Sequence, residues 1–308
     1  MDKPPFFVVG SPRSGTSLLR VMLDGHPRLA VPPESHFIVG LAPRLLRKVR
    51  GSTSLHKTLD DILGHERFQL WGLDVSDVRD RVLRSAPTTY SELIDVVFSS
   101  YAEAHGKSRW GDKTPGYVSH LPTLDRLFPT ARFIHIIRDG REAAASMAEM
   151  SWGPPSPVSA AFWWRSKVEK GRACGRLLSM ERYFELRLED LIEDPEEQLQ
   201  AICDFLEERY SPAMLDYPSR MTQRVSRPQN HHLTKPPTPG LRDWKAGLSA
   251  REQRAIDAVC RGSLQRLGYR SAGKDPVGLA YARSVRFRDL LLTTLPVLRA
   301  RLSTSRRF

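Results

Sequence analysis

The chain has 308 residues, 40% of them hydrophobic, and a formal net charge of +12 at pH 7. This length can bury one substantial α/β core with an insertion, but hardly two full domains. No run approaches the roughly 18 apolar residues of a membrane-spanning helix, and the first apolar strand begins at Phe6, too early for a signal peptide to precede it. The three cysteines, Cys174, Cys203 and Cys260, lack metal-ligand or CxxC spacing. We therefore expect free thiols in a soluble cytoplasmic protein.

The chain begins with the order strand, loop, helix. The apolar run Phe6–Val9 leads into a loop with Gly10 and Gly15, and apolar residues at helical spacing follow. In such a unit, backbone N–H groups and the positive end of the helix converge on an anion. The glycine spacing matches the first part of a Walker A loop, but Thr16 stands where the lysine belongs, and Arg13 brings the cation earlier. Because NTP chemistry uses that lysine, the loop instead predicts a cradle for a 5′-phosphate and a second tetrahedral anionic group.

The remaining elements alternate between helices and strands. Residues 40–108 are mostly helical in pattern and predict a helical insertion, while 131–137 predict a buried strand that a helix follows. Further along we expect a strand at 183–187 and helices at 158–180, 195–208 and 249–267. We expect a loop at 227–241. Near the end of the chain, Pro296 interrupts an apolar pattern with helical spacing. This order predicts an α/β fold with a parallel sheet and a ligand at the carboxyl ends of its strands.

Two motifs in this order resemble the PAPS-dependent sulfotransferases, more their tyrosylprotein and bacterial branch than the cytosolic one. Pro12–Ser17 is similar to the 5′-phosphosulfate loop of that family, and Ile137–Ser146 is similar to its 3′-phosphate motif. Trp110–Pro115 resembles the lysine-containing segment that precedes the second motif, and Leu188–Pro195 resembles the turn into a late helix. The resemblance extends from about Phe6 to Tyr269 and implies a P-loop-type central parallel sheet flanked by helices, with the insertion shaping the acceptor pocket.

The resemblance also implies a reaction and its residues. It implies PAPS as co-substrate and transfer of its sulfuryl group to a hydroxyl. Because we expect no secretory route, we favour a small-molecule, lipid or carbohydrate acceptor over a protein tyrosine. Arg138 and Ser146 would hold the 3′-phosphate, and Lys113 would donate to the leaving oxygen. The residues that would hold the phosphosulfate are Arg13, Ser14, Gly15, Thr16 and Ser17. We expect no metal, because sulfuryl transfer involves no pyrophosphate that needs magnesium and the His231–His232 pair lacks further ligands.

Two residues compete for the role of general base. Glu34 follows the first helix by a short turn that Pro32 and Pro33 stiffen, and the tyrosylprotein branch carries a glutamate at a matching place. His36 is the competitor, because the cytosolic branch uses histidine and a neutral imidazole suits pH 7. We favour Glu34 and keep His36 as the alternative.

The late loop offers further cofactor contacts. Ser226 and Lys235 resemble a segment that closes over the cofactor in the tyrosylprotein branch, and Arg242 precedes a DWK element similar to that of the cytosolic branch. The Arg-Lys-Gly triplet of the cytosolic branch is absent from this chain. The match to either branch is thus partial. We include three residues of this loop among the predicted cofactor-binding residues: Ser226, Lys235 and Arg242.

The end of the chain carries half of the excess charge. After a sulfotransferase domain at 1–275, residues 276–308 contain seven arginines and one acid, a net charge of +6, with leucines at helical spacing. A basic amphipathic helix can lie on an anionic membrane surface, or the tail can pack on the core. We expect no nucleic-acid partner, because no recognition motif accompanies the basic charge.

Two other functions remain open on sequence alone: a nucleotide-binding protein without transfer activity, and a P-loop kinase. A sulfotransferase should turn over PAPS without magnesium, a kinase should turn over ATP with magnesium, and a protein that only binds nucleotides should turn over neither. The insertion carries no motif that names the acceptor, and the sequence gives no oligomeric state.

Overall fold

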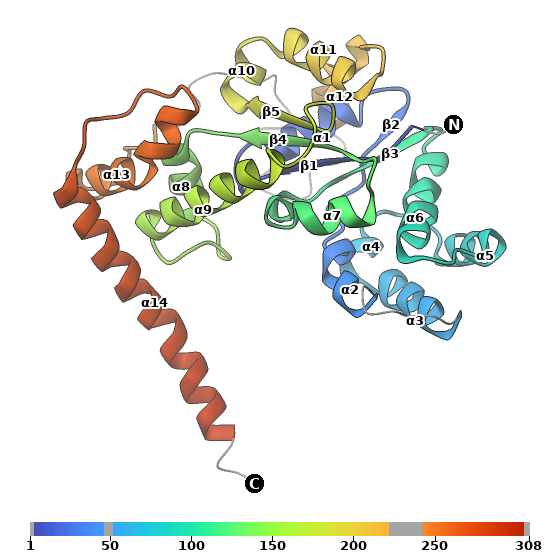
Figure 1. Ribbon diagram of the computed structural model, residues 1–308, viewed down its shortest axis with the longest axis horizontal. Helices are drawn as coiled ribbons and strands as arrows, with labels where there is room; N and C mark the ends of the chain where they lie inside the picture. Colours follow the sequence, from blue (N-terminus) through green and yellow to red (C-terminus); the bar gives the residue numbers. More distant parts are fainter. Residues whose placement is uncertain (1–2, 46–51, 222–242, 305–308) are drawn as a thin grey trace. The chain divides into compact units, whose positions relative to one another are not determined.

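The computed structural model describes residues 3–45, 52–221 and 243–304 (Figure 1). The chain groups into two compact units. The segments of unit 1 are Met1–Gly10, Gly15–Ile137 and Lys170–Pro239, and those of unit 2 are Ser11–Ser14, Arg138–Glu169 and Gly240–Phe308. The predicted phosphate loop therefore passes through both units, because its first four residues belong to unit 2 and its helix to unit 1.

Unit 1 is built on a five-stranded sheet with the order β2-β3-β1-β4-β5, and every neighbouring pair of strands is parallel. The strands are β1 (Phe6–Gly10), β2 (Leu29–Ala30), β3 (Arg109–Lys113), β4 (Arg132–Ile137) and β5 (Tyr183–Arg187). In the central pairing, Phe6 lies opposite Arg132 and Gly10 opposite Ile136. Because all strands run the same way, Gly10 and Lys113 end their strands at the same edge of the sheet. The predicted α/β class with a central parallel sheet is confirmed.

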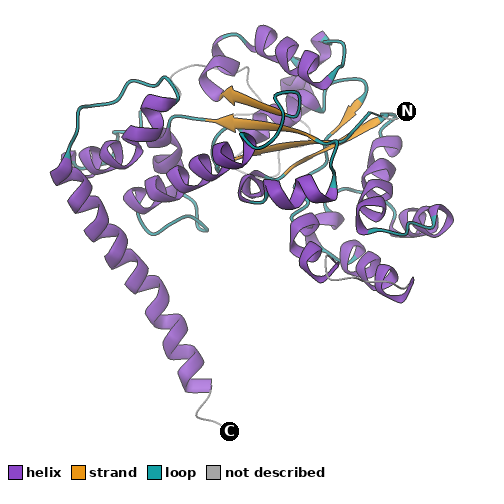
Figure 2. Ribbon diagram, viewed as in Figure 1, coloured by secondary structure: helices purple, strands orange, loops and turns teal. Residues whose placement is uncertain are grey.

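Helices cover both faces of this sheet (Figure 2). Phe7 and Val9 of β1 join a core with the helices α2 (Phe37–Leu45), α3 (Ser52–Leu63), α4 (Glu66–Gln69), α5 (Val75–Ser85), α6 (Tyr90–Ala104), η1 (Pro115–Ser119) and α7 (Leu121–Leu127). Phe6 and Val8 join a second core with α1 (Thr16–Leu23), α10 (Leu188–Glu193), α11 (Pro195–Leu206), η2 (Pro212–Met214) and α12 (Tyr217–Met221). Successive side chains of β1 point to opposite faces of the sheet, so they pack into the two different cores.

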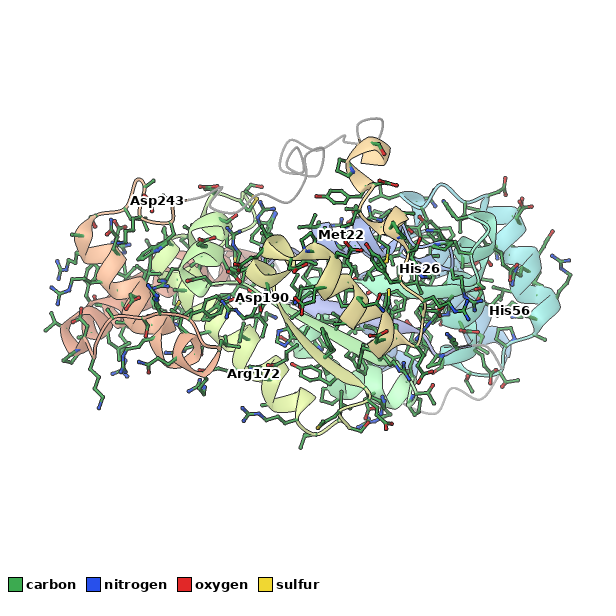
Figure 3. All side chains as sticks on the ribbon, turned by 90° about the horizontal axis from the view of Figure 1, so that it is seen from above. Met22, His26, His56, Arg172, Asp190 and Asp243 are labelled. Carbon is green, nitrogen blue, oxygen red and sulfur yellow. The ribbon has the colours of Figure 1, made fainter. Side chains whose placement is uncertain are left out.

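The turn after α1 is tied to the segment that follows α11. Met22, near the end of that helix, is fully buried, and His26 follows it in the turn (Figure 3). The His26 imidazole Nε2 lies 2.8 Å from the carbonyl oxygen of Arg209, and burial lowers the pKa of His26. This contact fixes the segment that leads from α1 to the Glu34 turn.

The helical pattern expected over 40–108 is found as the run from α2 to α6, outside residues 46–51, which the structure does not describe. Three of its helices begin with side-chain caps, and at the first of them, α4, the Arg67 backbone N–H donates to His65 Nδ1 at 3.1 Å. Asp74 accepts from the backbone N–H groups of Ser76 and Asp77, and Thr89 forms a capping box with Glu92. The strand β3 that follows was not predicted, because its polar residues conceal the strand pattern.

The described residues of unit 2 form four helices. They are α8 (Gly140–Ala148), the first part of α9 (Pro157–Gly175), α13 (Ala250–Arg266) and α14 (Pro276–Thr304). Gly140 packs against the Trp164 ring so closely that an added Cβ would lie 2.4 Å from it. The helix α14 continues through Pro296, where the sequence predicts an interruption. Within the described ranges, no helix has both the length and the apolar character needed to span a membrane.

Candidate anion and sulfuryl-transfer site

The first anion-binding element of unit 1 is the start of α1. Gly15 occupies the N-cap with φ of 85°, and an added Cβ there would lie 2.4 Å from a Leu188 methyl group. At Gly10, an added Cβ would lie 2.5 Å from the Ile136 carbonyl oxygen. Both positions therefore exclude side chains by close approach, and Gly15 also by its left-handed backbone. The first-turn N–H groups that follow, from Thr16 and Ser17 onward, have no carbonyl partners within the helix and suit an anion.

Beside this helix, Lys113 joins two predicted site residues. Its Nζ lies 2.5 Å from Glu34 Oε1 and 3.2 Å from Ser17 Oγ. The lysine is the last residue of β3, and its side chain is only 4% exposed, whereas that of Glu34 is 28% exposed. Residues from three separate segments of the chain are thus brought into one hydrogen-bonded group.

The ionisation of this pair follows from its surroundings. Burial opposes the charged form of Glu34, but the hydrogen bond to His36 and the charge of Lys113 outweigh it and lower the pKa of Glu34 to about 2. Burial lowers the pKa of Lys113, while the Glu34 carboxylate counteracts the shift. Glu34 is therefore a carboxylate at neutral pH, but its proton affinity is low while both partners contact it.

His36 belongs to the same group. Its Nε2 lies 2.9 Å from Glu34 Oε2, its side chain is 43% exposed, and its backbone has φ of 56°. A left-handed backbone at a residue with a Cβ is strained, and such strain is concentrated at functional turns. The two candidate bases are in direct contact, with Glu34 between His36 and Lys113.

A buried polar network supports the Glu34 turn, and the sequence analysis missed it. The Ser35 backbone N–H donates to Thr114 Oγ1 at 3.2 Å, and that hydroxyl donates to Asp112 Oδ1 at 3.2 Å. Ser35 Oγ also lies 3.1 Å from the Tyr117 hydroxyl. Burial raises the pKa of Asp112 to about 6, against the hydrogen bonds from Ser35 and Thr114 that lower it. The signal in the sequence was an acid directly before the predicted lysine.

The second group of predicted residues lies in unit 2. Arg13 has φ of 66°, and its Nε donates to Ser146 Oγ at 3.0 Å. Arg138 donates from Nη1 to the Arg13 carbonyl oxygen at 3.3 Å and from Nη2 to Glu142 at 2.5 Å. The residues of the first and second motifs within this unit are thus hydrogen-bonded to one another.

Ser14 offers an unused polar group. Its hydroxyl is buried and has no hydrogen-bond partner among the described residues. Such a group costs free energy unless a ligand or water satisfies it. A phosphate oxygen is a suitable acceptor for this hydroxyl, so the loop fits the anionic co-substrate that its sequence predicts.

Arg141, three residues after Arg138, has a different environment. Its guanidinium donates to Asp139 Oδ2 at 2.6 Å and to Asp257 Oδ1 at 2.8 Å. Burial opposes its charge, but these two carboxylates raise the pKa of Arg141 above its usual range. The Arg141 guanidinium thus stabilises the fold through two carboxylates, which distinguishes it from Arg138, our candidate for phosphate binding.

The predicted contacts of the late loop are not described by the structure. Ser226, Lys235 and Arg242 all lie outside the described residues. The DWK element is described: the Lys245 backbone N–H donates to Asp243 Oδ1 at 3.0 Å, and the Arg141 guanidinium lies 5.6 Å from the centre of the Trp244 ring. Across 3–45, 52–221 and 243–304, no group of three or more potential metal ligands occurs.

The fold and the anion-binding loop define a P-loop-type α/β protein, and comparison with known proteins identifies its family. The family model described as "Sulfotransferase family" matches residues 4–212. The chain belongs to this family and is a PAPS-dependent sulfotransferase.

Three relatives show the extent of the similarity. Protein-tyrosine sulfotransferase 1 of Danio rerio is 27% identical over 87% of this chain and 73% of its own length. The protein of the same name from Homo sapiens is 33% identical, but the match covers 47% of this chain and 34% of the human protein. The sulfotransferase domain of the Synechococcus PCC 7002 olefin synthase superimposes with a TM-score of 0.62 and 27% identity over 88% of this chain and 98% of that domain.

Proposed function

We propose that the protein transfers the sulfuryl group of PAPS to a hydroxyl of a small-molecule, lipid or carbohydrate acceptor, with Glu34 as general base. The observation that carries this proposal is the contact of Lys113 Nζ with both Glu34 and Ser17 at the start of α1. This contact places the carboxylate of Glu34, a proton acceptor, and the ammonium group of Lys113, a cation, beside the N-terminus of α1. A helix N-terminus is a favourable place for the negative charge of a phosphosulfate.

The transfer step assigns one role to each side chain. The Glu34 carboxylate takes the proton of the acceptor hydroxyl as the acceptor oxygen bonds to sulfur. The bond between sulfur and the bridging oxygen breaks, and its electron pair stays on the phosphate of the leaving 3′-phosphoadenosine 5′-phosphate. Lys113 donates a hydrogen bond to that oxygen, and the N–H groups at the start of α1 stabilise the charge on the phosphosulfate.

The low pKa of Glu34 gives Lys113 a second role in this proposal. While Lys113 contacts the carboxylate, Glu34 is ionised but weakly basic, because its pKa is about 2. When the lysine turns to the phosphosulfate, the carboxylate loses a positive partner, and its pKa rises toward the value that effective proton transfer needs. PAPS binding would thus activate the base by withdrawing its counter-ion.

The 3′-phosphate gives the site its preference among nucleotides. We assign this phosphate to Arg138 and Ser146, with Arg13 beside the serine. The buried hydroxyl of Ser14 supports an anion at the same loop. Charge-assisted hydrogen bonds of this kind contribute about 1.5–3 kcal/mol each.

The acceptor class rests on a different argument. The match to a complete sulfotransferase domain of an olefin synthase supports a small-molecule acceptor. We therefore favour an aliphatic or aromatic alcohol over a protein tyrosine as the acceptor.

The test measures release of 3′-phosphoadenosine 5′-phosphate from PAPS against a panel of alcohols, phenols, lipids, glycans and a tyrosine peptide. The wild-type protein should turn over PAPS without magnesium and should not turn over ATP with it. Glu34→Gln should remove turnover, whereas Glu66→Gln, a matched change at an exposed glutamate of unit 1, should leave it intact. ATP turnover would indicate a kinase, and PAPS binding without transfer to any acceptor would indicate a nucleotide-binding protein.

A further inference from the structure

One face of α14 is fixed against the rest of unit 2. Ala282, Val285 and Asp289 recur at helical spacing and are only 0%, 6% and 4% exposed. The Asp289 carboxylate accepts from Ser159 Oγ at 2.8 Å and also from Ser156 Oγ. These serines lie at the start of α9, so the contacts determine which face of α14 turns inward.

The opposite face of α14 exposes large apolar side chains. Phe287 is 63% exposed, Leu290 is 57% exposed and Leu291 is 40% exposed. At 3.6 residues per turn, these three lie away from the buried stripe. The later half of the helix extends beyond the other elements of unit 2 (Figure 1). A contiguous apolar face of this kind on a soluble helix marks an interaction site.

The charge around this face has one sign. Arg283, Arg286 and Arg288 are exposed on α14, whereas the acid of the segment, Asp289, is buried on the inner face. Four more arginines and no acid follow in the sequence after residue 293. A partner for the outer face must therefore accept apolar side chains and carry negative charge.

A shallow groove beside the outer face has the same character. Phe162, Trp163 and Leu290 line a groove of about 280 Å³, and the Arg286 guanidinium lies 4.7 Å from the centre of the Phe162 ring. Trp152, which is 50% exposed, stands edge-on to Trp163. Tryptophan with its amphipathic ring is enriched where proteins meet the headgroup region of a membrane.

We propose that the outer face of α14, formed by Phe287, Leu290 and Leu291 with Arg283 and Arg286, binds the surface of an anionic phospholipid bilayer. The apolar side chains would enter the boundary between headgroups and acyl chains, and the arginines would contact lipid phosphates. A second copy of this chain fits less well, because pairing two such faces would bring arginines together. A nucleic acid satisfies the charge but leaves the apolar side chains exposed. This binding is independent of the proposed reaction at Glu34.

The test uses the full chain and phosphatidylcholine vesicles with and without phosphatidylglycerol. The wild-type protein should co-sediment with the anionic vesicles, and added salt should weaken the binding. Phe287→Ser combined with Leu291→Ser should reduce the affinity at least tenfold, since both side chains would lose their burial in lipid. Arg283→Gln should reduce it about fivefold.

Matched controls come from another exposed region. Leu177 and Met180 are 83% and 91% exposed in the turn after α9, so Leu177→Ser with Met180→Ser removes as much exposed apolar surface elsewhere. Arg176→Gln is the matched loss of an exposed arginine. Both controls should bind anionic vesicles like the wild-type protein, and all variants should bind 3′-phosphoadenosine 5′-phosphate equally.

Three results would overturn the proposal. The first is equal binding to neutral and anionic vesicles, and the second is unchanged binding of the Phe287/Leu291 variant. The third is a preference for a DNA or RNA duplex, or a concentration-dependent dimer that this variant abolishes, either of which would assign the outer face to another partner.

Discussion

The charged side chains in the two groups of predicted site residues differ in their burial and in their partners. In unit 1, Lys113 and Asp112 are almost completely buried, and Lys113 is held by Glu34 and Ser17. In unit 2, the side chain of Arg138 is 17% exposed, and its carboxylate partner, Glu142, lies four residues later in the first turn of α8. Burial makes the charges of unit 1 interdependent, which suits proton transfer, whereas a guanidinium with a local partner suits recognition of an incoming phosphate.

This difference separates two kinds of effect. Substitutions at the buried group should change the rate of the chemical step, and substitutions at Arg138 should change the affinity for the nucleotide. Variants of Glu34, Lys113, Arg138 and Asp112 test that separation.

Glu34→Gln should have the largest effect. The amide keeps the size of the side chain but cannot take the acceptor proton, so kcat should fall by about 10²–10⁴-fold, the usual range for loss of a general base. Binding of 3′-phosphoadenosine 5′-phosphate, measured by calorimetry, should remain. His36→Asn should be milder. The comparison needs an aliphatic alcohol, because a phenol is acidic enough to weaken both effects. If His36→Asn were nearly inactive and Glu34→Gln nearly intact, the base would be His36.

Lys113→Met should come next. The variant keeps the length and the apolar stem of the side chain but loses the donor to the leaving oxygen, so kcat should fall by about 10²–10³-fold. Removal of the cation should also raise the pKa of Glu34, since Lys113 helps to lower it. The acid limb of the pH profile of kcat/KM, which reports the free enzyme, should therefore move to higher pH. An acid limb at the same pH as in the wild-type protein would show that Lys113 does not control the base.

Arg138→Ala should act on affinity. Wild-type protein should bind 3′-phosphoadenosine 5′-phosphate at least tenfold more tightly than AMP, and the variant should lose this discrimination. Arg141→Ala is the matched control, because Arg141 is held by Asp139 and Asp257. It should lower the melting temperature but keep the discrimination. Equal calorimetric affinities of the wild-type protein for both nucleotides would contradict the 3′-phosphate assignment.

Asp112→Asn should have the smallest effect. It should change how the free energy of unfolding depends on pH. The pKa of Asp112 is about 6 in the folded protein against 3.8 ordinarily, so the folded state binds more protons between these values. Its contribution to stability is therefore full below pH 3.8 and falls as pH rises through 6, by about 1 kcal/mol between pH 5 and 7. The Asn variant should lack this decline when urea unfolding is compared at the two pH values.

Other groups in the wild-type protein titrate in the opposite sense. Burial lowers the pKa of His135 to about 3. Its contribution to the stability of the folded protein therefore increases as pH rises toward 6.5. Glu34, whose pKa is lowered to about 2, contributes its full stabilisation above pH 4.5 and loses it as pH falls below that value. The difference between wild-type and Asn variant cancels both contributions. An identical pH dependence in the two proteins would show that Asp112 is not the titrating group.

The sequence by itself determined the elements with strong local signals. The strand, glycine loop and helix at Phe6–Leu23 and the apolar strand at 132–137 are patterns that short stretches of chain define by themselves. The parallel sheet followed from their alternation with helices, and the family followed from two short motifs. Ser17 was named from the local strand, loop and helix pattern, whereas Glu34 and Lys113 were named from the resemblance to the family.

Only the tertiary structure decided how these residues meet. Because Arg109–Lys113 is polar in sequence, the strand β3 becomes evident only when its neighbours bury it between β1 and β2. That pairing places Lys113 beside Glu34 and turns Asp112 into the buried centre of a network with Thr114 and Ser35. The outer face of α14 was likewise decided by packing, because a helical pattern of leucines does not tell which side a neighbouring helix covers. Local propensity is encoded in adjacent residues, whereas burial and contact depend on residues far apart in the chain.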